Sequence, residues 1–299
     1  MSVDVAVTHR KRSVRSGIAF GGVEAGGCRR RRRSRGMRPR LLVVGGGRMG
    51  TALVGGLVAA GWDPGSVAVV EADAGRRIVL AETLPGVSVM NRPTAAEGAV
   101  VAVKPGDAEG ACRALAEVGP GRVLSIMAGV LLARLESWLG PGPAVVRAMP
   151  NTPALVGAGV SALPGGSRAA EADVAWAEEI LGAVGRVVRL EEASLDAATG
   201  LSGSGPAYIF LVAEALIAAG VEAGLDPEVS RTLTLETIAG AGRLLVETGE
   251  EPETLRAQVT SPGGTTEAGL AALETSGLRK AFEVAVAAAT ARSRIMSLS

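Results

Sequence analysis

Short runs of apolar residues alternate with helical patterns through the first two thirds of the chain. The runs Leu41 to Val44, Ala99 to Pro105, Arg122 to Val130 and Ala144 to Pro153 are apolar without alternation. Strands of this kind are buried on both faces, as in a parallel sheet covered by helices. The pattern predicts an α/β fold that begins with a doubly wound Rossmann sheet and ends its last strand near Leu190.

The hydrophobic pattern changes after residue 190, where strand-like runs stop and Ala/Leu-rich helical patterns begin. The expected helices run from Pro206 to about Gly224, over about 228–247, from Pro252, and over about 278–296. Apolar helices with small-residue faces favour contact with a second subunit. We therefore expect an all-α dimerisation domain and a homodimer or a higher homo-oligomer.

These patterns divide the chain into three parts. Residues 1–38 form an Arg-rich leader that we expect to be disordered, 39–190 a dinucleotide-binding Rossmann domain, and 191–299 a helical substrate and dimerisation domain. Residues 1–40 hold twelve of the 31 lysines and arginines but only two of the 30 acids, which leaves an acidic body. An acidic body with few aromatic residues predicts no nucleic-acid partner.

Cysteine and apolar content indicate the compartment. Cys28 and Cys112 are the only cysteines, too few for a disulfide framework, and no signal-peptide pattern is present. The apolar run 197–213 is broken by Gly, Ser and Pro and followed by Glu214, so we expect no membrane span. The sequence predicts a cytoplasmic protein.

The single histidine, His9, lies in the leader. The body therefore has no imidazole for acid–base catalysis, no Ser/His or Cys/His pair and no ordinary metal site. The chemistry must need little proton transfer from the protein.

A glycine-rich turn follows the first predicted strand. Gly45, Gly47 and Gly50 fit the G-x-G-x-x-G pattern between a buried strand and a helix. In this context the glycines permit a tight turn, backbone approach to a pyrophosphate, and close packing of helix on strand. The turn predicts a dinucleotide site at the helix N-terminus.

The second strand ends in two conflicting signals for the cofactor. Glu71 is placed to bind the ribose hydroxyls of NAD, whereas Arg76 and Arg77 are placed to meet the 2′-phosphate of NADP. These residues alone do not decide between NAD and NADP as the cofactor.

Three later loops follow the carboxyl ends of strands and are expected along the same crevice. They hold Lys104 and Pro105, Ala128 and Gly129, and 151–153. The alternative is that these are ordinary loop residues that bind no ligand.

In the stretch "TSPGGTTEAG", two glycines without side chains stand at the start of a late helix. Pro262 fixes a bend, and Gly263 and Gly264 leave amides exposed for a small carboxylate or phosphate. The alternative is an ordinary helix cap by Ser261 or Thr265.

Five motifs together resemble one enzyme family. "VVGGGRMGTAL", "AVKP", "RAMPNTP", "TGLSGSGPAY" and "VTSPGGTTEAGLAALETSG" are similar, in order and spacing over residues 37–299, to pyrroline-5-carboxylate reductases. The resemblance implies hydride transfer from NADPH, with NADH as the alternative, to 1-pyrroline-5-carboxylate, which gives L-proline in the last step of proline biosynthesis. The stretch "EADAGRR" departs from the Ser/Arg pattern often linked to NADP.

The resemblance also implies site residues. Those for the cofactor are Gly45, Gly46, Gly47, Arg48, Met49, Gly50, Asn91, Ala102, Val103, Lys104, Pro105, Ile126, Met127, Ala128, Asn151 and Thr152. Those for the substrate are Ser261, Gly263, Gly264, Thr266 and Glu192. In this interpretation the amides of Gly263 and Gly264 bind the ring carboxylate, and Thr266, the catalytic candidate, hydrogen-bonds the imine nitrogen.

Two other functions remain as alternatives. A β-hydroxyacid dehydrogenase needs a lysine in the helical domain, where Lys280 lacks a surrounding motif. A non-catalytic nucleotide sensor would keep the fold without turnover.

Overall fold

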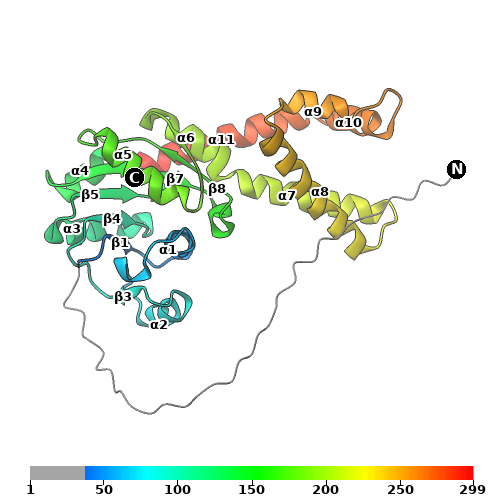
Figure 1. The fold of residues 1–299 in the computed structure, drawn as a ribbon. Coiled ribbons are helices and arrows are strands. Elements are labelled where there is room, and N and C mark those ends of the chain that lie inside the picture. The colour runs from blue at the N-terminus through cyan, green and yellow to red at the C-terminus, as the bar shows by residue number, and fades with distance from the viewer. Residues whose placement is uncertain (1–37, 299) are drawn as a thin grey trace, which may run out of the picture. The chain divides into compact units, whose positions relative to one another are not determined.

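The computed structural model describes residues 38–298, so the predictions made for the leader lie outside the described residues. The first half of the chain forms a six-stranded parallel sheet with the strand order β3-β2-β1-β4-β5-β6 (Figure 1). Its strands are β1 (Leu41–Val44), β2 (Val67–Val70), β3 (Ser88–Met90), β4 (Gly98–Val101), β5 (Arg122–Ser125) and β6 (Ala144–Arg147). This order confirms the predicted doubly wound arrangement.

Helices cover both faces of the sheet. They are α1 (Arg48–Ala59), α2 (Ala74–Thr83), α3 (Ala108–Val118), α4 (Leu132–Leu139) and α5 (Glu171–Gly182). Leu53 of α1 and Ile180 of α5 belong to one core cluster, and Leu115 of α3 and Leu135 of α4 belong to the other. The central strands β1, β2 and β4 are buried at every position, which explains why their sequences show no polar alternation.

A second, three-stranded sheet follows the first. It contains β7 (Met149–Pro150), β8 (Gly159–Leu163) and β9 (Gly185–Arg189), with β7 antiparallel and β9 parallel to β8. The prediction of one strand over 144–153 was wrong, because the chain leaves the large sheet after Arg147. The backbone N–H of Arg147 donates to the carbonyl oxygen of Pro164 at 3.1 Å, and this contact turns the chain toward the small sheet.

Helices form the rest of the chain. They are α6 (Leu195–Ala198), α7 (Gly205–Glu222), α8 (Pro227–Thr248), α9 (Pro252–Gln258), α10 (Thr265–Thr275) and α11 (Leu278–Leu298). The predicted helix positions agree with these bounds within a few residues. Asp226 caps α8 by accepting a hydrogen bond from the N–H of Glu228 at 2.9 Å, as expected for a polar residue before a helical proline.

The change from strands to helices occurs between Arg189 and the short helical turn Glu192–Ser194. Packing does not separate the chain at this point, because residues 38–299 form one unit by their contacts. The Oγ of Ser293 on α11, for example, donates to Asp196 Oδ1 on α6 at 2.6 Å. The division into two domains near residue 190 therefore stays a prediction.

The apolar run after residue 196 is not interrupted as the sequence analysis expected. Its glycines and serines form a π-helical turn, Thr199–Gly203, and the path from Glu192 to Glu222 is helical over 31 residues. Within the described residues, this path alone is long and apolar enough to cross a membrane by length and composition. A helix at a subunit interface meets the same two criteria, so they do not establish a membrane span.

The helices α7 to α10 bury few of their own side chains. Ala213 is the buried residue of α7, Ser230 and Thr234 are those of α8, and Leu255 is that of α9. Large apolar side chains on these helices are exposed in the single chain, including Phe210 at 61%. An apolar surface of this extent is typical of a protein interface.

Candidate functional site

The glycine turn between β1 and α1 has the geometry of a dinucleotide cradle. Gly45 has a φ of +108°, and a Cβ there would lie 2.6 Å from the carbonyl oxygen of Ala102. A Cβ on Gly50 would overlap the carbonyl oxygen of Gly45, whereas one on Gly47 would meet nothing within 4 Å. Gly47 is the N-cap of α1 and has no side-chain cap. The residues therefore fit a pyrophosphate at this helix N-terminus.

A cleft of about 800 Å³ extends from this turn across the ends of β1, β2 and β4. The predicted residues that line it are Gly45, Gly47, Asn91, Ala102, Val103 and Lys104. Pro105 starts a short 3₁₀ helix, Pro105–Asp107, beside the cleft. Gly46 and Arg48 line a neighbouring cleft on the α2 side of the turn.

Sequence reasoning missed one wall of the cleft, which is made by the start of α3. Gly106, Gly110, Ala111 and Ala114 line it together with Asp107. The signal for this wall was the spacing of small residues at three and four positions apart, which places them on one helix face.

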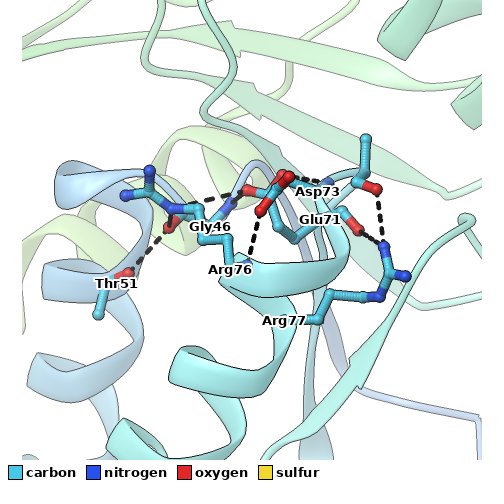
Figure 2. Close-up of polar contacts among 7 residues, drawn as sticks. Gly46, Thr51, Glu71, Asp73, Arg76 and Arg77 are labelled. Atoms are coloured by element: carbon cyan, nitrogen blue, oxygen red, sulfur yellow. Dashed lines mark hydrogen bonds and ion pairs between the residues drawn. The ribbon is translucent and has the colours of Figure 1, made fainter.

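A polar network joins the glycine turn to the end of β2 (Figure 2). Glu71 Oε2 accepts a hydrogen bond from the N–H of Gly46 at 3.1 Å, and Oε1 accepts from the N–H of Asp73 at 3.0 Å. Arg76 Nε donates to the carbonyl oxygen of Gly46 at 2.8 Å and lies 3.9 Å from Glu71 Oε2. Of the three charged residues that the sequence linked to the choice of cofactor, Glu71 and Arg76 therefore line the same cleft, whereas Arg77 does not.

The residues after β5 contact the core more than the cleft. Ile126 and Met127 are buried and belong to the two core clusters, one on each face of the sheet. Their side chains are thus unavailable to a cofactor, and a role at the cleft would fall to their backbone and to the half-buried Ala128. Gly129 lies against Met296 of α11, because a Cβ there would come within 3.2 Å of the Met296 Cβ.

Asn151 is buried, and both ends of its side-chain amide are occupied. Its Nδ2 donates to the carbonyl oxygen of Ser202 at 3.1 Å, and its Oδ1 accepts from the N–H of Val160 at 2.9 Å. Asn151 therefore links the small sheet to the π-helical turn, while Thr152 is exposed beside it. Their predicted approach to the nicotinamide stays a prediction.

Glu192 has structural partners that its sequence neighbourhood did not reveal. Its Oε1 accepts from the N–H of Leu132 at 2.8 Å and from Arg147 Nη1 at 2.8 Å. The Arg147 side chain is only 4% exposed. The structure therefore places Glu192 at the junction of α4, β6 and the helical part, where it neutralises a buried guanidinium.

The turn before α10 differs from the predicted anion pocket in its hydrogen bonds. The N–H of Gly263 donates to Glu267 Oε2 at 2.7 Å, and that of Gly264 donates to the carbonyl oxygen of Ser261 at 3.0 Å. Glu267, in the first turn of α10, reaches back to the amide of Gly263, one residue before the N-cap Gly264, and no side chain caps this helix. The two amides expected to bind a carboxylate are thus already paired in the single chain.

Within one chain this turn is not part of the nucleotide cleft. The residues lining the cleft all lie between Val44 and Ala114. Helix α10 packs against α11, and Figure 1 shows it apart from β1 and α1. Ser261 and Thr266 are exposed.

Cys112, in α3, is fully buried. Burial raises the pKa of its thiol to about 11, so the thiolate is disfavoured at neutral pH. The residue is therefore a core side chain and no candidate nucleophile.

Known proteins resemble both halves of the chain. The family profile described as pyrroline-5-carboxylate reductase dimerisation matches residues 192–296, and the one described as NADP oxidoreductase, coenzyme F420-dependent, matches residues 40–129. The pyrroline-5-carboxylate reductase of Mycobacterium tuberculosis is 40% identical over 288 residues, which cover 87% of this chain and 97% of the relative.

Solved structures agree with these sequence matches. The structure of a pyrroline-5-carboxylate reductase from Coxiella burnetii has a TM-score of 0.82 and 36% identity, and the match covers 87% of this chain and 99% of that one. The Plasmodium falciparum pyrroline carboxylate reductase with NADP bound has a TM-score of 0.76 and 29% identity, over 88% of this chain and 100% of that one.

Proposed function

The chain belongs to the pyrroline-5-carboxylate reductase family, and from this premise we propose that it reduces 1-pyrroline-5-carboxylate to L-proline with NADPH in proline biosynthesis. The observation that carries the proposal is the 40% identity to a reductase over nearly its whole length, glycine turn and late helices included. The NADP-bound relative and the NADP oxidoreductase profile support the choice of cofactor.

The reaction requires little proton transfer by protein side chains. The cofactor supplies a hydride from its nicotinamide ring to the imine carbon, and the nitrogen carries one proton when the imine reacts. A protonated imine is already a strong hydride acceptor, so positioning is the main task of the chain. This explains how a body without histidine can perform the reaction.

The turn before α10 is the proposed carboxylate site. One carboxylate, that of Glu267, already binds the N–H of Gly263 at 2.7 Å, so the turn can hold such a group. The first amides of α10, at Thr265 and Thr266, have no acceptor within the helix, because they precede its first hydrogen-bonded turn. We assign the substrate carboxylate to these amides, and the Thr266 hydroxyl to the imine nitrogen.

A second subunit completes the proposed site. The turn and the cleft lie apart in one chain, and the helices around the turn expose apolar side chains such as Phe210 and Leu233, at 61% and 54%. A homodimer formed through these helices buries that surface and can bring the turn of one subunit to the cleft of the other. Ser261 would then lie beside the substrate. The cytoplasmic location of the protein remains a prediction.

The direct test is the fall in NADPH absorbance when 1-pyrroline-5-carboxylate is added to the purified chain. A second assay measures whether the chain oxidises a 3-hydroxyacid with NADP⁺. Formation of proline is the expected result. Oxidation of the hydroxyacid instead would indicate a β-hydroxyacid dehydrogenase. Tight nucleotide binding with turnover in neither assay would indicate a sensor, and either outcome would overturn the proposal.

Thr266→Ala is expected to lower turnover by about a hundredfold, because the imine nitrogen loses its hydrogen-bonding partner. The dissociation constant for NADP⁺ should stay within about twofold, since the nucleotide cleft is formed elsewhere in the chain. Steady-state kinetics and calorimetry measure the two quantities. The matched control is Thr275→Ala, at the other end of α10, where the hydroxyl donates to the carbonyl oxygen of Ala271 at 2.8 Å. Equal turnover of the two variants would remove Thr266 from the mechanism.

Mixed dimers test whether the site is shared. Subunits carrying Thr266→Ala are unfolded and refolded together with subunits carrying Gly47→Ala, whose cleft should stay largely empty at an NADPH concentration that just fills the wild-type cleft. If each site takes its cleft from one subunit and its turn from the other, equal mixing restores about a quarter of the wild-type activity. If both parts come from the same subunit, no intact site forms and activity stays at background.

A further inference from the structure

The π-helical turn before α7 leaves two backbone carbonyls without their α-helical donors. The N–H of Ser204, which would reach the carbonyl of Gly200 in an α-helix, donates instead to the carbonyl oxygen of Thr199 at 2.9 Å. The carbonyl of Ser202 would accept from the residue four positions on, which is Pro206 and has no N–H. A carbonyl that loses its donor away from water is costly, so both need a donor from elsewhere.

Two side chains supply these donors. The hydroxyl of Tyr208 donates to the carbonyl oxygen of Gly200 at 3.0 Å, and Nδ2 of Asn151 donates to that of Ser202 at 3.1 Å. Tyr208 lies in the first turn of α7, whereas Asn151 is the N-cap of the 3₁₀ helix Thr152–Val156, which follows the small strand β7. The two hydrogen bonds therefore tie the segment after β7 to the base of the helical part.

Glycines let this turn lie against two further elements. A Cβ on Gly200 would overlap Oγ1 of Thr290 on α11, and one on Gly203 would lie 3.1 Å from Cε of Met149 on β7. The π turn is thus packed between the small sheet and the last helix. Because the backbone stays helical from the turn into α7, the shape of the turn sets the direction in which α7 leaves it.

The turn joins two parts of the proposed active site. Asn151 leads into Thr152, which is expected beside the nicotinamide, and α7 is the first of the helices whose exposed apolar side chains suit a second subunit. Both border one largely apolar cleft of about 570 Å³, which Pro153, Leu201 and Phe210 also line. The angle between α7 and the segment after β7 therefore affects how the cofactor meets the partner's turn.

We propose that the π turn is a positioning element for hydride transfer, in which the side chains of Tyr208 and Asn151 hold α7 at a fixed angle to the segment beside the nicotinamide. The proposal rests on the proposed function for its reaction. The two side chains act through the turn and not on the reacting atoms, and a displacement of about 1 Å at those atoms can cost about a hundredfold in rate. The stretch "TGLSGSGPAY" thereby gains a role, since its glycines permit close packing, its proline removes a donor and its tyrosine supplies one.

Tyr208→Phe tests the proposal with the smallest change, because it removes the hydroxyl and keeps the ring. We expect kcat to fall about tenfold, while the dissociation constant for NADP⁺ stays within about twofold. The deuterium isotope effect on kcat, measured with NADPH deuterated at both C4 positions of the nicotinamide, should rise. A poorly aligned hydride step is slower and therefore limits turnover more fully, whereas a loss of folded protein changes no isotope effect.

Ser230→Ala is the matched control. Its hydroxyl also donates to a carbonyl of α7, that of Ile217 at 2.8 Å, but in the second half of the helix. Both variants lose one hydrogen bond to a helix carbonyl, so both should lower the midpoint of urea denaturation by similar amounts. Turnover of Ser230→Ala should stay within about twofold of wild type. Equal losses of turnover in the two variants, or an unchanged kcat and isotope effect in Tyr208→Phe, would overturn the proposal.

Asn151→Asp tests the other hydrogen bond. Aspartate keeps an acceptor for the N–H of Val160, which donates to Oδ1 of Asn151 at 2.9 Å, but its carboxylate cannot donate to the carbonyl of Ser202. We expect turnover to fall about a hundredfold. Adding Pro206→Ala gives that carbonyl an N–H and should recover stability but not turnover, since an α-helical turn directs α7 differently. Recovery of both would contradict a positioning role. If Asn151→Asp does not fold, Tyr208→Phe decides.

The outcomes separate this proposal from the proposed function. A chain that reduces 1-pyrroline-5-carboxylate while Tyr208→Phe keeps the wild-type kcat refutes the role of the turn and not the function. A wild-type chain that binds NADPH without reducing the substrate refutes the function, and the fluorescence of bound NADPH then decides on the turn. That emission depends on how the nicotinamide is held, so it should differ from wild type in Tyr208→Phe but not in Ser230→Ala. Identical emission of all three would refute the role of the turn.

Discussion

Glu192→Gln is expected to lower the free energy of unfolding by about 3 kcal/mol, because it leaves a buried guanidinium without a counter-charge. Arg147 is 4% exposed, and its Nη1 lies 2.8 Å from Glu192 Oε1. Its Nε has no hydrogen-bond partner, so Glu192 is the one carboxylate that compensates this charge in the described structure. The glutamine can still accept from the N–H of Leu132, so the effect isolates the lost charge.

Urea denaturation of three variants measures this effect. Glu191→Gln is the matched control, because Glu191 is exposed and adjacent, and it should stay within about 0.5 kcal/mol of wild type. Arg147→Met should be less harmful than Glu192→Gln, since the carboxylate that remains is 30% exposed and can be hydrated. Equal stabilities of the Glu191 and Glu192 variants, together with lost turnover for the latter, would instead support the substrate contact expected from the sequence.

The Glu192 pair shows what kind of information the sequence lacked. Strands β1, β4 and β5 were predictable because burial on both faces leaves largely apolar runs. The glycine turn was predictable because Gly45 and Gly50 leave no room for a Cβ, and because Gly47 stands at the helix N-terminus that a pyrophosphate must approach. The partners of Glu192, by contrast, lie 45 and 60 residues away along the chain. No local pattern marks a contact of that range, so the side chain was assigned to the substrate by resemblance alone.

Local competition explains two differences between the expected and the observed hydrogen bonding in the helical part. Paired glycines before α10 did predict a turn with outward amides, and Gly263 has the positive φ, +71°, that such a turn requires. The acid in the first turn of the same helix, Glu267, is close enough to occupy one of those amides before any ligand does. Glycines and serines at 199–203 predicted a break, yet a π turn keeps their backbone helical while Gly200 lies against Thr290 of α11.

Alanine substitutions at three glycines, two in the glycine turn and one within α1, should separate folding from cofactor binding. Gly50→Ala places a Cβ on the carbonyl oxygen of Gly45, so α1 must move away from β1, and the free energy of unfolding should fall by about 2 kcal/mol or more. Gly55→Ala, in the middle of α1, meets no atom within 4 Å and should raise stability by about 0.5 kcal/mol. It is the control for the effect of alanine in this helix.

Gly47→Ala is expected to have a large effect on cofactor binding. Its backbone φ is −66°, which alanine adopts freely, and a Cβ there meets no protein atom within 4 Å, so the fold should be unchanged. The methyl group would stand at the open helix N-terminus, where the pyrophosphate must approach the backbone closely. We expect the dissociation constant for NADP⁺ to rise by about a hundredfold at unaltered thermal stability. Normal nucleotide affinity in this variant would mean that the phosphates do not bind at the first turn of α1, and the assignment of the cleft would then be wrong.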